Sequence, residues 1–194
     1  MITLAAAATL AVTGTGCAFK EPGQGRAAGE DGVKEGHVES GDEPVREGVG
    51  IELEGLTYTV FITRQLNPQD PEDRDYYQGP PPPPGSALYG IFFKACNDGK
   101  APAMAAEKFK VTSTQDQEFE PVELPKTNIF AYRPGGLSAK QCIPNELSTA
   151  AQAPAAGSLV VFEIPITATE NRPMELEIEP PSGKGAPALV ELDI

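Results

Sequence analysis

The strongest alternation of hydrophobic and polar positions lies between residues 88 and 99, the densest aromatic stretch in a chain without Trp. Its side chains follow a two-residue repeat, which predicts a strand with one face in a core. One side of the repeat holds Tyr89, Ile91, Phe93 and Ala95, and the other holds Gly90, Phe92, Lys94 and Cys96. The Asn97-Asp98-Gly99 run predicts a tight turn, because these residue types tolerate a positive φ. We therefore expect this strand to be central to the fold.

Shorter runs with the same alternation flank this strand and predict an all-β fold, an antiparallel β-sandwich over residues 49–194. Pro and Gly each occur 20 times, which favours short strands and many turns. We expect residues 145–156 to form a loop, and Ile129, Phe130 and Tyr132 to be tucked under the sandwich. The alternating runs lie at residues 51–53, 56–62, 109–111, 160–164, 174–178 and 188–194.

Residues 1–16 are uncharged and contain an apolar run from Ile2 to Val12. An apolar segment of about ten residues followed by small residues predicts a secretory signal peptide, and it is short for a transmembrane helix. Cys17 follows directly and resembles the lipobox cysteine of bacterial lipoproteins, which is diacylated and becomes the mature N-terminus. Gly14 stands where a lipobox usually has Leu, and no Lys or Arg precedes the apolar run, which fits a start codon further upstream. We expect export and a lipid anchor on Cys17, with plain secretion and a retained anchor as alternatives.

Residues 17–48 are rich in Glu, Gly, Asp and Lys and contain almost no large apolar side chains. Such a segment cannot bury enough surface to offset its chain entropy, so we expect a disordered, acidic tether. The only His of the chain, His37, lies in this segment. A Ser-His-Asp or Cys-His site needs a His held by the fold, so we expect no catalytic residues. We also expect no metal site and no cofactor.

The formal net charge of −13 and the sequence pI of about 4.5 argue against nucleic acid and anionic lipid head groups as partners. The carboxylates at residues 70–75 lack the order of ligands and the Gly of an EF-hand, so they are interpreted as a solvated loop. Glu118 and Glu120 have the residue type of a glycosidase pair, but they are more simply the wet face of a strand.

The most unusual segment is an insertion at residues 67–85, which is longer than a strand connection requires. Its five consecutive prolines, Pro80 to Pro84, predict a stiff polyproline II rod. We expect the insertion to bind a partner, because tyrosines are good interface anchors. The alternative is a solvated spacer whose tyrosines pack back onto the sandwich. The candidate partner-binding residues are Asp73, Arg74, Asp75, Tyr76 and Tyr77.

Two cysteines remain once Cys17 is assigned to lipid, and both would lie in an oxidising compartment. We expect Cys96 and Cys142 to form a disulfide that ties the end of the central strand to the segment before the late strands. Two separate buried thiols are the alternative.

Core and turn patterns recur in five segments of the chain, residues 54–60, 93–97, 108–111, 115–119 and 157–165. Together they resemble the immunoglobulin-like domains of unknown function found in surface lipoproteins of Gram-positive and actinobacterial cells. The resemblance covers roughly residues 49–194 and implies an immunoglobulin-like β-sandwich and an exported, lipid-anchored protein. It implies no catalytic residues. The long Pro-rich insertion and the two cysteines depart from the simplest members.

Three functions remain open at this stage. The first is a non-catalytic interaction or scaffold module on the outer face of the cytoplasmic membrane, with an unknown envelope protein as partner. The second is a carbohydrate- or cell-wall-binding module that would use exposed aromatics such as Phe61, Tyr76 and Tyr77. The third, ranked last, is a hydrolase with carboxylate chemistry.

Overall fold

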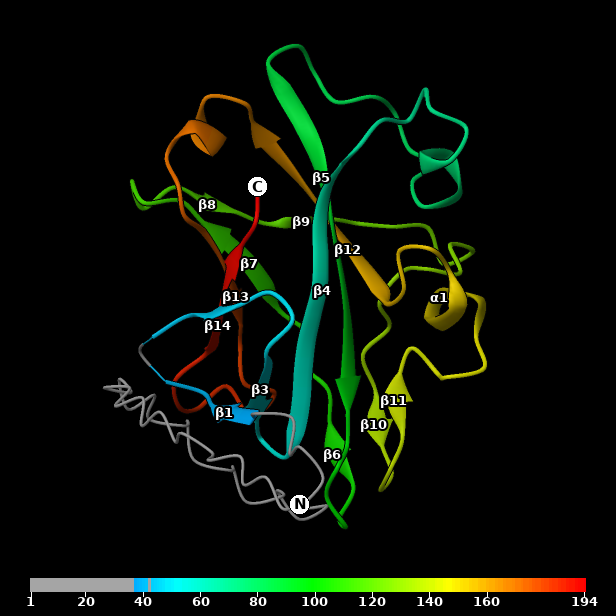
Figure 1. Ribbon diagram of the computed structural model, residues 1–194, viewed down its shortest axis with the longest axis vertical. Helices are drawn as coiled ribbons and strands as arrows, with labels where there is room; N and C mark the ends of the chain where they lie inside the picture. Colours follow the sequence, from blue (N-terminus) through cyan, green and yellow to red (C-terminus); the bar gives the residue numbers. More distant parts are fainter. Residues whose placement is uncertain (1–36, 42) are drawn as a thin grey trace, which may run out of the picture. The chain divides into compact units, whose positions relative to one another are not determined.

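The computed structural model describes residues 37–41 and 43–194 (Figure 1). The predicted signal segment, Cys17 and most of the predicted tether lie outside these residues. Two sheets contain most of the strands. The first contains β1 (His37–Glu39), β3 (Gly50–Leu53), β4 (Leu56–Leu66), β5 (Ser86–Cys96), β12 (Ser158–Pro165), β9 (Pro121–Val122) and β11 (Cys142–Ile143). The second contains β2 (Val45–Arg46), β14 (Ala188–Leu192), β13 (Met174–Ile178), β7 (Phe109–Thr112) and β8 (Glu118–Phe119).

The remaining elements are short. β6 (Ala103–Met104) pairs with β10 (Gly136–Leu137) in a small antiparallel ribbon. One α-helix, α1 (Thr149–Gln152), lies in the segment expected to be a loop, and Ser148 caps it by accepting a hydrogen bond from the Ala151 N–H. The described residues also contain two 3₁₀ turns, η1 (Asp73–Asp75) and η2 (Ala168–Glu170).

The strand order confirms the predicted immunoglobulin-like sandwich. The order β4-β5-β12-β9 in the first sheet and β14-β13-β7-β8 in the second reproduces the two-sheet arrangement of immunoglobulin domains. In that comparison β4, β5, β12 and β9 take the places of strands A, B, E and D. Strands C, F and G correspond to β7, β13 and β14, and β8 is added beside β7. All pairs among these strands are antiparallel.

The main core lies between the two sheets and follows the predicted alternation. On β13, Met174, Leu176 and Ile178 are buried, whereas Glu175 and Glu177 are half-exposed. On β5, Ile91, Phe93 and Ala95 point into the same core, where the Phe93 ring lies 4.8 Å from the ring of Tyr132, between centroids. Burial of these apolar side chains is the main favourable contribution to the fold.

A second hydrophobic cluster covers the outer face of the first sheet. The prediction that one face of β5 lies in a core is confirmed by Ile91, Phe93 and Ala95, and the opposite face is buried as well. Leu88 and Phe92 of β5 and Leu159 and Val161 of β12 point away from the main core and are also buried. They are apolar because other segments cover them, as in strands that are buried on both faces. The covering residues are Tyr76, Tyr77, Leu124, Phe130, Ala131, Ala150 and Ala155.

Two other expectations differ from the structure: the extent of the predicted tether and the burial of Ile129. The predicted tether extends to Gly48, but β1 already pairs in parallel with β3, and β2 pairs in parallel with β14, so His37 lies in a strand. Glu47 connects this N-terminal segment to both sheets. Its carboxylate accepts the Thr63 N–H of the first sheet (3.2 Å) and the Asp193 N–H that follows β14 (3.1 Å). Phe130 and Tyr132 are buried as expected, but Ile129 is 65% exposed.

Candidate functional site

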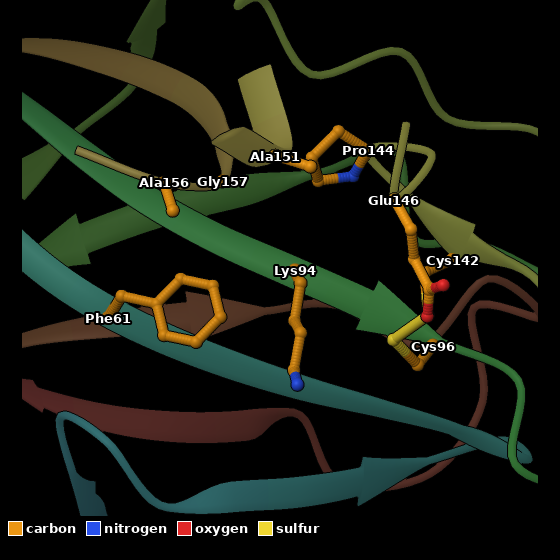
Figure 2. A pocket seen from close by; sticks show the side chains of 9 residues that line it. All are labelled: Phe61, Lys94, Cys96, Cys142, Pro144, Glu146, Ala151, Ala156 and Gly157. Atoms are coloured by element: carbon orange, nitrogen blue, oxygen red, sulfur yellow. A yellow bond between two sulfur atoms is a disulfide. The ribbon is translucent and has the colours of Figure 1, made fainter. Parts of the chain in front are cut away.

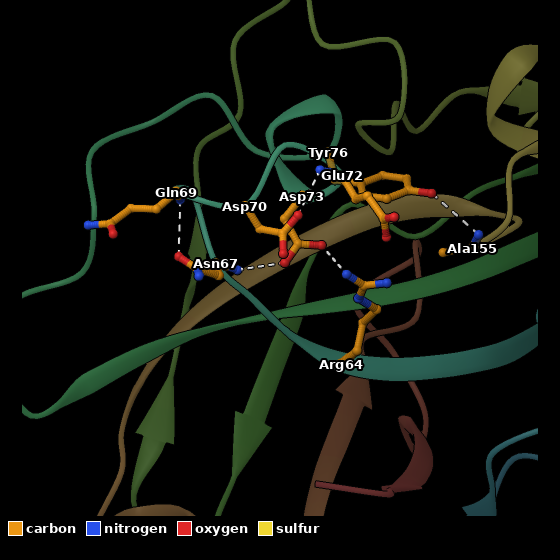
Figure 3. Close-up of polar contacts among 8 residues, drawn as sticks. All are labelled: Arg64, Asn67, Gln69, Asp70, Glu72, Asp73, Tyr76 and Ala155. Atoms are coloured by element: carbon orange, nitrogen blue, oxygen red, sulfur yellow. Dashed lines mark hydrogen bonds and ion pairs between the residues drawn. The ribbon is translucent and has the colours of Figure 1, made fainter.

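The first half of the insertion contains an acidic side chain that is buried in the protein. Asp73 is buried at the start of η1. Its carboxylate accepts the Asn67 N–H (2.8 Å) and pairs with the Arg64 guanidinium of β4 (Figure 3). A buried carboxylate is stable only when its oxygens are paired in this way. The first turn of the insertion is therefore fastened to the outer face of the sheet.

Tyr76 and Tyr77 are 6% and 4% exposed, so the interpretation of these tyrosines as surface anchors is wrong. The Tyr76 ring meets Phe92 edge-on at 5.0 Å and lies 4.7 Å from Phe130, between centroids. Its hydroxyl accepts a long hydrogen bond from the Ala155 N–H (3.4 Å), as Figure 3 shows. The physical reason is the apolar outer face of β5, which needs a cover. The alternative, in which the tyrosines pack back onto the sandwich, describes the structure.

The second half of the insertion is exposed. Of Pro80 to Pro84, all but the half-buried Pro82 are exposed. Before the rod, the Tyr77 ring lies so close to Gly79 that no Cβ fits there. After it, the Ser86 N–H donates to the Pro83 carbonyl (3.0 Å) and β5 begins. Packed structure therefore holds the proline run at both of its ends.

A groove of about 710 Å³ lies between the insertion and the segment around α1. The edges of Tyr76 and Phe130 line it together with Arg64. Glu72 and Asp75 contribute from the insertion, and Leu147 contributes from the segment before α1. Of the five candidate partner-binding residues, Asp75 and Tyr76 line this groove, and Arg74 lines a neighbouring hollow with Tyr77.

A smaller pocket of about 240 Å³ includes Ala151 of α1 in its lining (Figure 2). Its lining includes Phe61, Lys94 and the sulfur atoms of Cys96 and Cys142, which form a disulfide between paired residues of β5 and β11. The register of β4 against β5 shifts between Val60 and Ile62, and this bulge leaves Phe61 41% exposed. The Lys94 ammonium lies 5.5 Å from the centre of the Phe61 ring. The pocket therefore combines an aromatic face with a cation.

The surroundings of three tyrosines raise the pKa of their hydroxyl groups. Burial is the main cause that raises the pKa of Tyr58, Tyr77 and Tyr132 above its ordinary value. For Tyr132 the neighbouring Tyr58 raises the pKa further, and for Tyr77 the charge of Glu163 does so. These groups are protonated at neutral pH, and the hydroxyls of Tyr58 and Tyr132 form hydrogen bonds with Ala106 in the main core.

A lysine of the second sheet pairs with two carboxylates. Glu118 pairs with Lys110 (2.9 Å), as a strand-surface carboxylate does, and Glu177 joins the same lysine (3.2 Å). Within residues 37–41 and 43–194, no three His, Cys, Asp or Glu side chains are grouped so as to hold a metal ion. The described part of the chain also has no helix whose length and apolar content would let it cross a membrane.

Sequence reasoning identified the insertion but missed the groove. One wall of the groove comes from β4 and the insertion that directly follows it. The other wall comes from Phe130 and the segment around α1, which lie much later in the sequence and meet the first wall only in the fold. One local signal was present, because Leu147 stands between polar residues in a segment assigned to a loop. Single exposed apolar residues are common on protein surfaces, so this signal alone does not indicate a groove.

No family model and no curated protein matches the chain. Among solved structures, it is similar to the yjhA protein of Bacillus subtilis, at 13% identity and TM-score 0.48, over 77% of this chain and 99% of that one. An uncharacterised β-sandwich protein of Clostridium difficile 630 has 13% identity and TM-score 0.45, over 78% and 95%. A functionally unknown protein of Listeria monocytogenes EGD-e has 11% identity and TM-score 0.47, over 78% and 84%. All three TM-scores lie below 0.5, so these likenesses add nothing about a site.

Proposed function

We propose that the chain is a non-catalytic interaction module of the bacterial cell envelope, anchored through lipid on Cys17, and that it presents Pro80 to Pro84 to a partner protein. The observation that carries the proposal is the division of the insertion. Residues 67–79 are fastened to the sandwich through three buried side chains, Asp73, Tyr76 and Tyr77, whereas the proline run that follows them is exposed apart from the half-buried Pro82.

The partner that fits such a rod is a domain with a groove lined by aromatic side chains. Proline fixes φ, so a run of prolines is already close to its bound conformation and loses little entropy on binding. The packing of Tyr77 against Gly79 and the turn at Ser86 restrict the rod further. Polyproline recognition needs no charge on the rod, and this run has none.

The anchor is supported by the sequence pattern around Cys17, which lies outside the described residues. Two acyl chains give stable membrane attachment, whereas a single chain gives only marginal binding. We expect the wild-type chain to fractionate with membranes and the Cys17→Ala chain to be released. Intact mass of the mature protein checks the acylation directly. Equal membrane fractionation of both chains would contradict the lipoprotein assignment.

Partner binding is tested by site-specific photo-cross-linking on intact cells. The cross-linking amino acid p-benzoyl-phenylalanine replaces Pro84, and a control chain carries it at Met104 on β6, at the opposite end of the sandwich (Figure 1). We expect one discrete protein adduct from position 84 and none of the same mass from position 104. Adding Pro81→Ala and Pro83→Ala should abolish that adduct. An adduct that persists in this variant would move the partner site away from the rod.

A carbohydrate-binding role is the second candidate, and one observation favours it. Of Phe61, Tyr76 and Tyr77, only Phe61 is exposed, and it lies in a pocket with Lys94 and Glu146. A sugar ring would stack on Phe61 and hydrogen-bond to these two polar side chains. Glycan arrays probed with the wild type and with Phe61→Ala separate the two functions. Glycan binding that depends on Phe61, without a protein adduct from position 84, would favour this second candidate.

A further inference from the structure

We propose that the groove between the insertion and α1 is a second, independent binding site, and that it takes a peptide segment carrying Lys or Arg next to a large apolar residue. The cation would lie against Glu72 and Asp75, and the apolar side chain would lie against Leu147. This site differs from the proline rod in position and in chemistry, and it does not depend on the partner of the rod.

The size and the walls of the groove fit a peptide side-chain pair. Its volume of about 710 Å³ lies within the range of roughly 300–1,000 Å³ typical of ligand sites. The floor includes the edges of Tyr76 and Phe130, which are fixed because both rings belong to the second hydrophobic cluster. The groove is therefore held open by packed residues.

The charge of the groove selects a cation. Glu72 and Asp75 are exposed and form no ion pair within the part of the chain that the structure describes. Within residues 37–41 and 43–194, Arg64 is the one cation in the lining, and its charge is matched by Asp73. Arg74 is exposed and lines the neighbouring hollow, which shares Asp75 with the groove, but it forms no ion pair with Asp75. Two carboxylates therefore remain for a ligand.

Leu147 supplies the apolar half of the site. It is 87% exposed, and its backbone is nevertheless fixed. Asn145 Oδ1 accepts the Leu147 N–H (3.0 Å), and the Asn145 carbonyl accepts the Ser148 N–H (2.8 Å). Ser148 in turn caps α1. The turn thus holds a large apolar side chain in water at the rim of the groove, where a partner would bury it.

The charge of the whole protein acts in the same direction. A formal net charge of −13 attracts cationic segments at long range and repels acidic ones. Association should therefore weaken with added salt, because the contributing charges are exposed and screened.

The absence of Trp from the chain gives a direct assay. The probe is an acetylated, amidated peptide with the sequence Gly-Arg-Trp-Leu-Gly, and its Trp emission is titrated with the full chain. Its charge-reversed partner has Glu in place of Arg. We expect a blue shift with the Arg peptide only, and at least tenfold weaker binding in 0.5 M salt than in 0.05 M salt.

Variants locate the site. We expect Glu72→Gln with Asp75→Asn to weaken binding by about tenfold or more, and Leu147→Ser to weaken it severalfold. The matched controls remove two exposed carboxylates elsewhere, Asp98→Asn with Glu170→Gln, and an exposed apolar residue elsewhere, Ile166→Ser. These controls should bind as the wild type does. Thermal unfolding of each variant checks that the fold is kept.

Four results would overturn the proposal. The first is equal binding by the groove variants and their controls, and the second is equal binding of the charge-reversed peptide. The third is no change in Trp emission up to millimolar protein. The fourth is displacement of the peptide by agmatine at the same concentration as by unlabelled peptide, which would make the groove a site for a small amine instead.

Discussion

Arg64 of β4 and Asp73 of the insertion form an ion pair on the outer face of the first sheet, nine residues apart in sequence. Asp73 is almost fully buried, whereas the Arg64 side chain is partly exposed. The same carboxylate accepts the Asn67 N–H where β4 ends, so it closes the first loop of the insertion on itself. This contact positions Tyr76 over Phe92, and it also matches the charge of Arg64 in the groove.

Asp73→Ala should lower the free energy of unfolding by about 1–3 kcal/mol, because it leaves the Asn67 N–H without its partner and the Arg64 charge unmatched. Asp75→Ala is the matched control, since its side chain is exposed, and it should change stability by no more than about 0.5 kcal/mol. Urea unfolding of both variants measures the difference. Equal stability of the two variants would show that the pair does not fasten the insertion.

In the main core, the hydroxyls of Tyr58 and Tyr132 form hydrogen bonds with the backbone N–H and carbonyl of Ala106. The Ala106 N–H donates to the Tyr58 hydroxyl (2.7 Å), and the Tyr132 hydroxyl donates to the Ala106 carbonyl (2.9 Å). Tyr58→Phe should cost about 1–3 kcal/mol, because it leaves a buried N–H without an acceptor. Tyr89→Phe removes a hydroxyl from a half-buried ring and should be nearly neutral. A loss of stability as large for Tyr89→Phe would contradict this interpretation.

Alkaline pH should destabilise the protein through the same tyrosines. Burial raises the pKa of Tyr58 and Tyr132 in the folded state, whereas an unfolded tyrosine loses its proton near pH 10. The folded state then binds more protons than the unfolded state above about pH 10, so stability falls as pH rises. Below that pH the contribution is fully present. Urea unfolding at pH 8, 9.5 and 11 should show the fall, with a smaller slope in Tyr132→Phe. A slope as steep in the variant would assign the fall to other groups.

Loss of the Cys96–Cys142 disulfide should lower stability by about 3–4 kcal/mol in the chain-entropy model, given a sequence separation of 46 residues. The variant Cys96→Ser with Cys142→Ser tests this, and the wild type treated with reductant should agree with it. Thiol labelling of the unfolded wild type without reductant should find no free thiol apart from any unprocessed Cys17. Two reactive thiols per chain would refute the bond.

The sequence predicted those parts of the fold in which one strand face alone is buried. Met174, Leu176 and Ile178 alternate with glutamates because β13 meets water on its outer side. The same rule failed for Phe92 and Leu159, since their face is covered by residues remote in sequence. Apolar residues on the outer face of a strand indicate that another segment covers that face, and Tyr76 is one of the residues that do so. The groove could not be predicted, because Arg64, Glu72 and Leu147 are brought together only by that cover.

The division of the insertion also changes which variant is informative. Replacing Asp70 to Pro84 by a short Gly-Ser turn would remove Tyr76 and Tyr77 from the second cluster. Its loss of binding would then be inseparable from its loss of structure. Single substitutions on either side of Gly79 keep the two parts distinct.

The most direct test of this division is the free energy of unfolding of Tyr76→Ala and Pro81→Ala, measured by urea unfolding under the same conditions. Tyr76→Ala should lose about 3–5 kcal/mol, the usual cost of removing a buried aromatic ring. Pro81→Ala should lose no more than about 1 kcal/mol, through the greater freedom of the unfolded chain, because the Pro81 side chain is exposed. The account predicts this large difference between neighbouring parts of one loop. A loss of less than about 1 kcal/mol for Tyr76→Ala, or equal losses for the two variants, would contradict it.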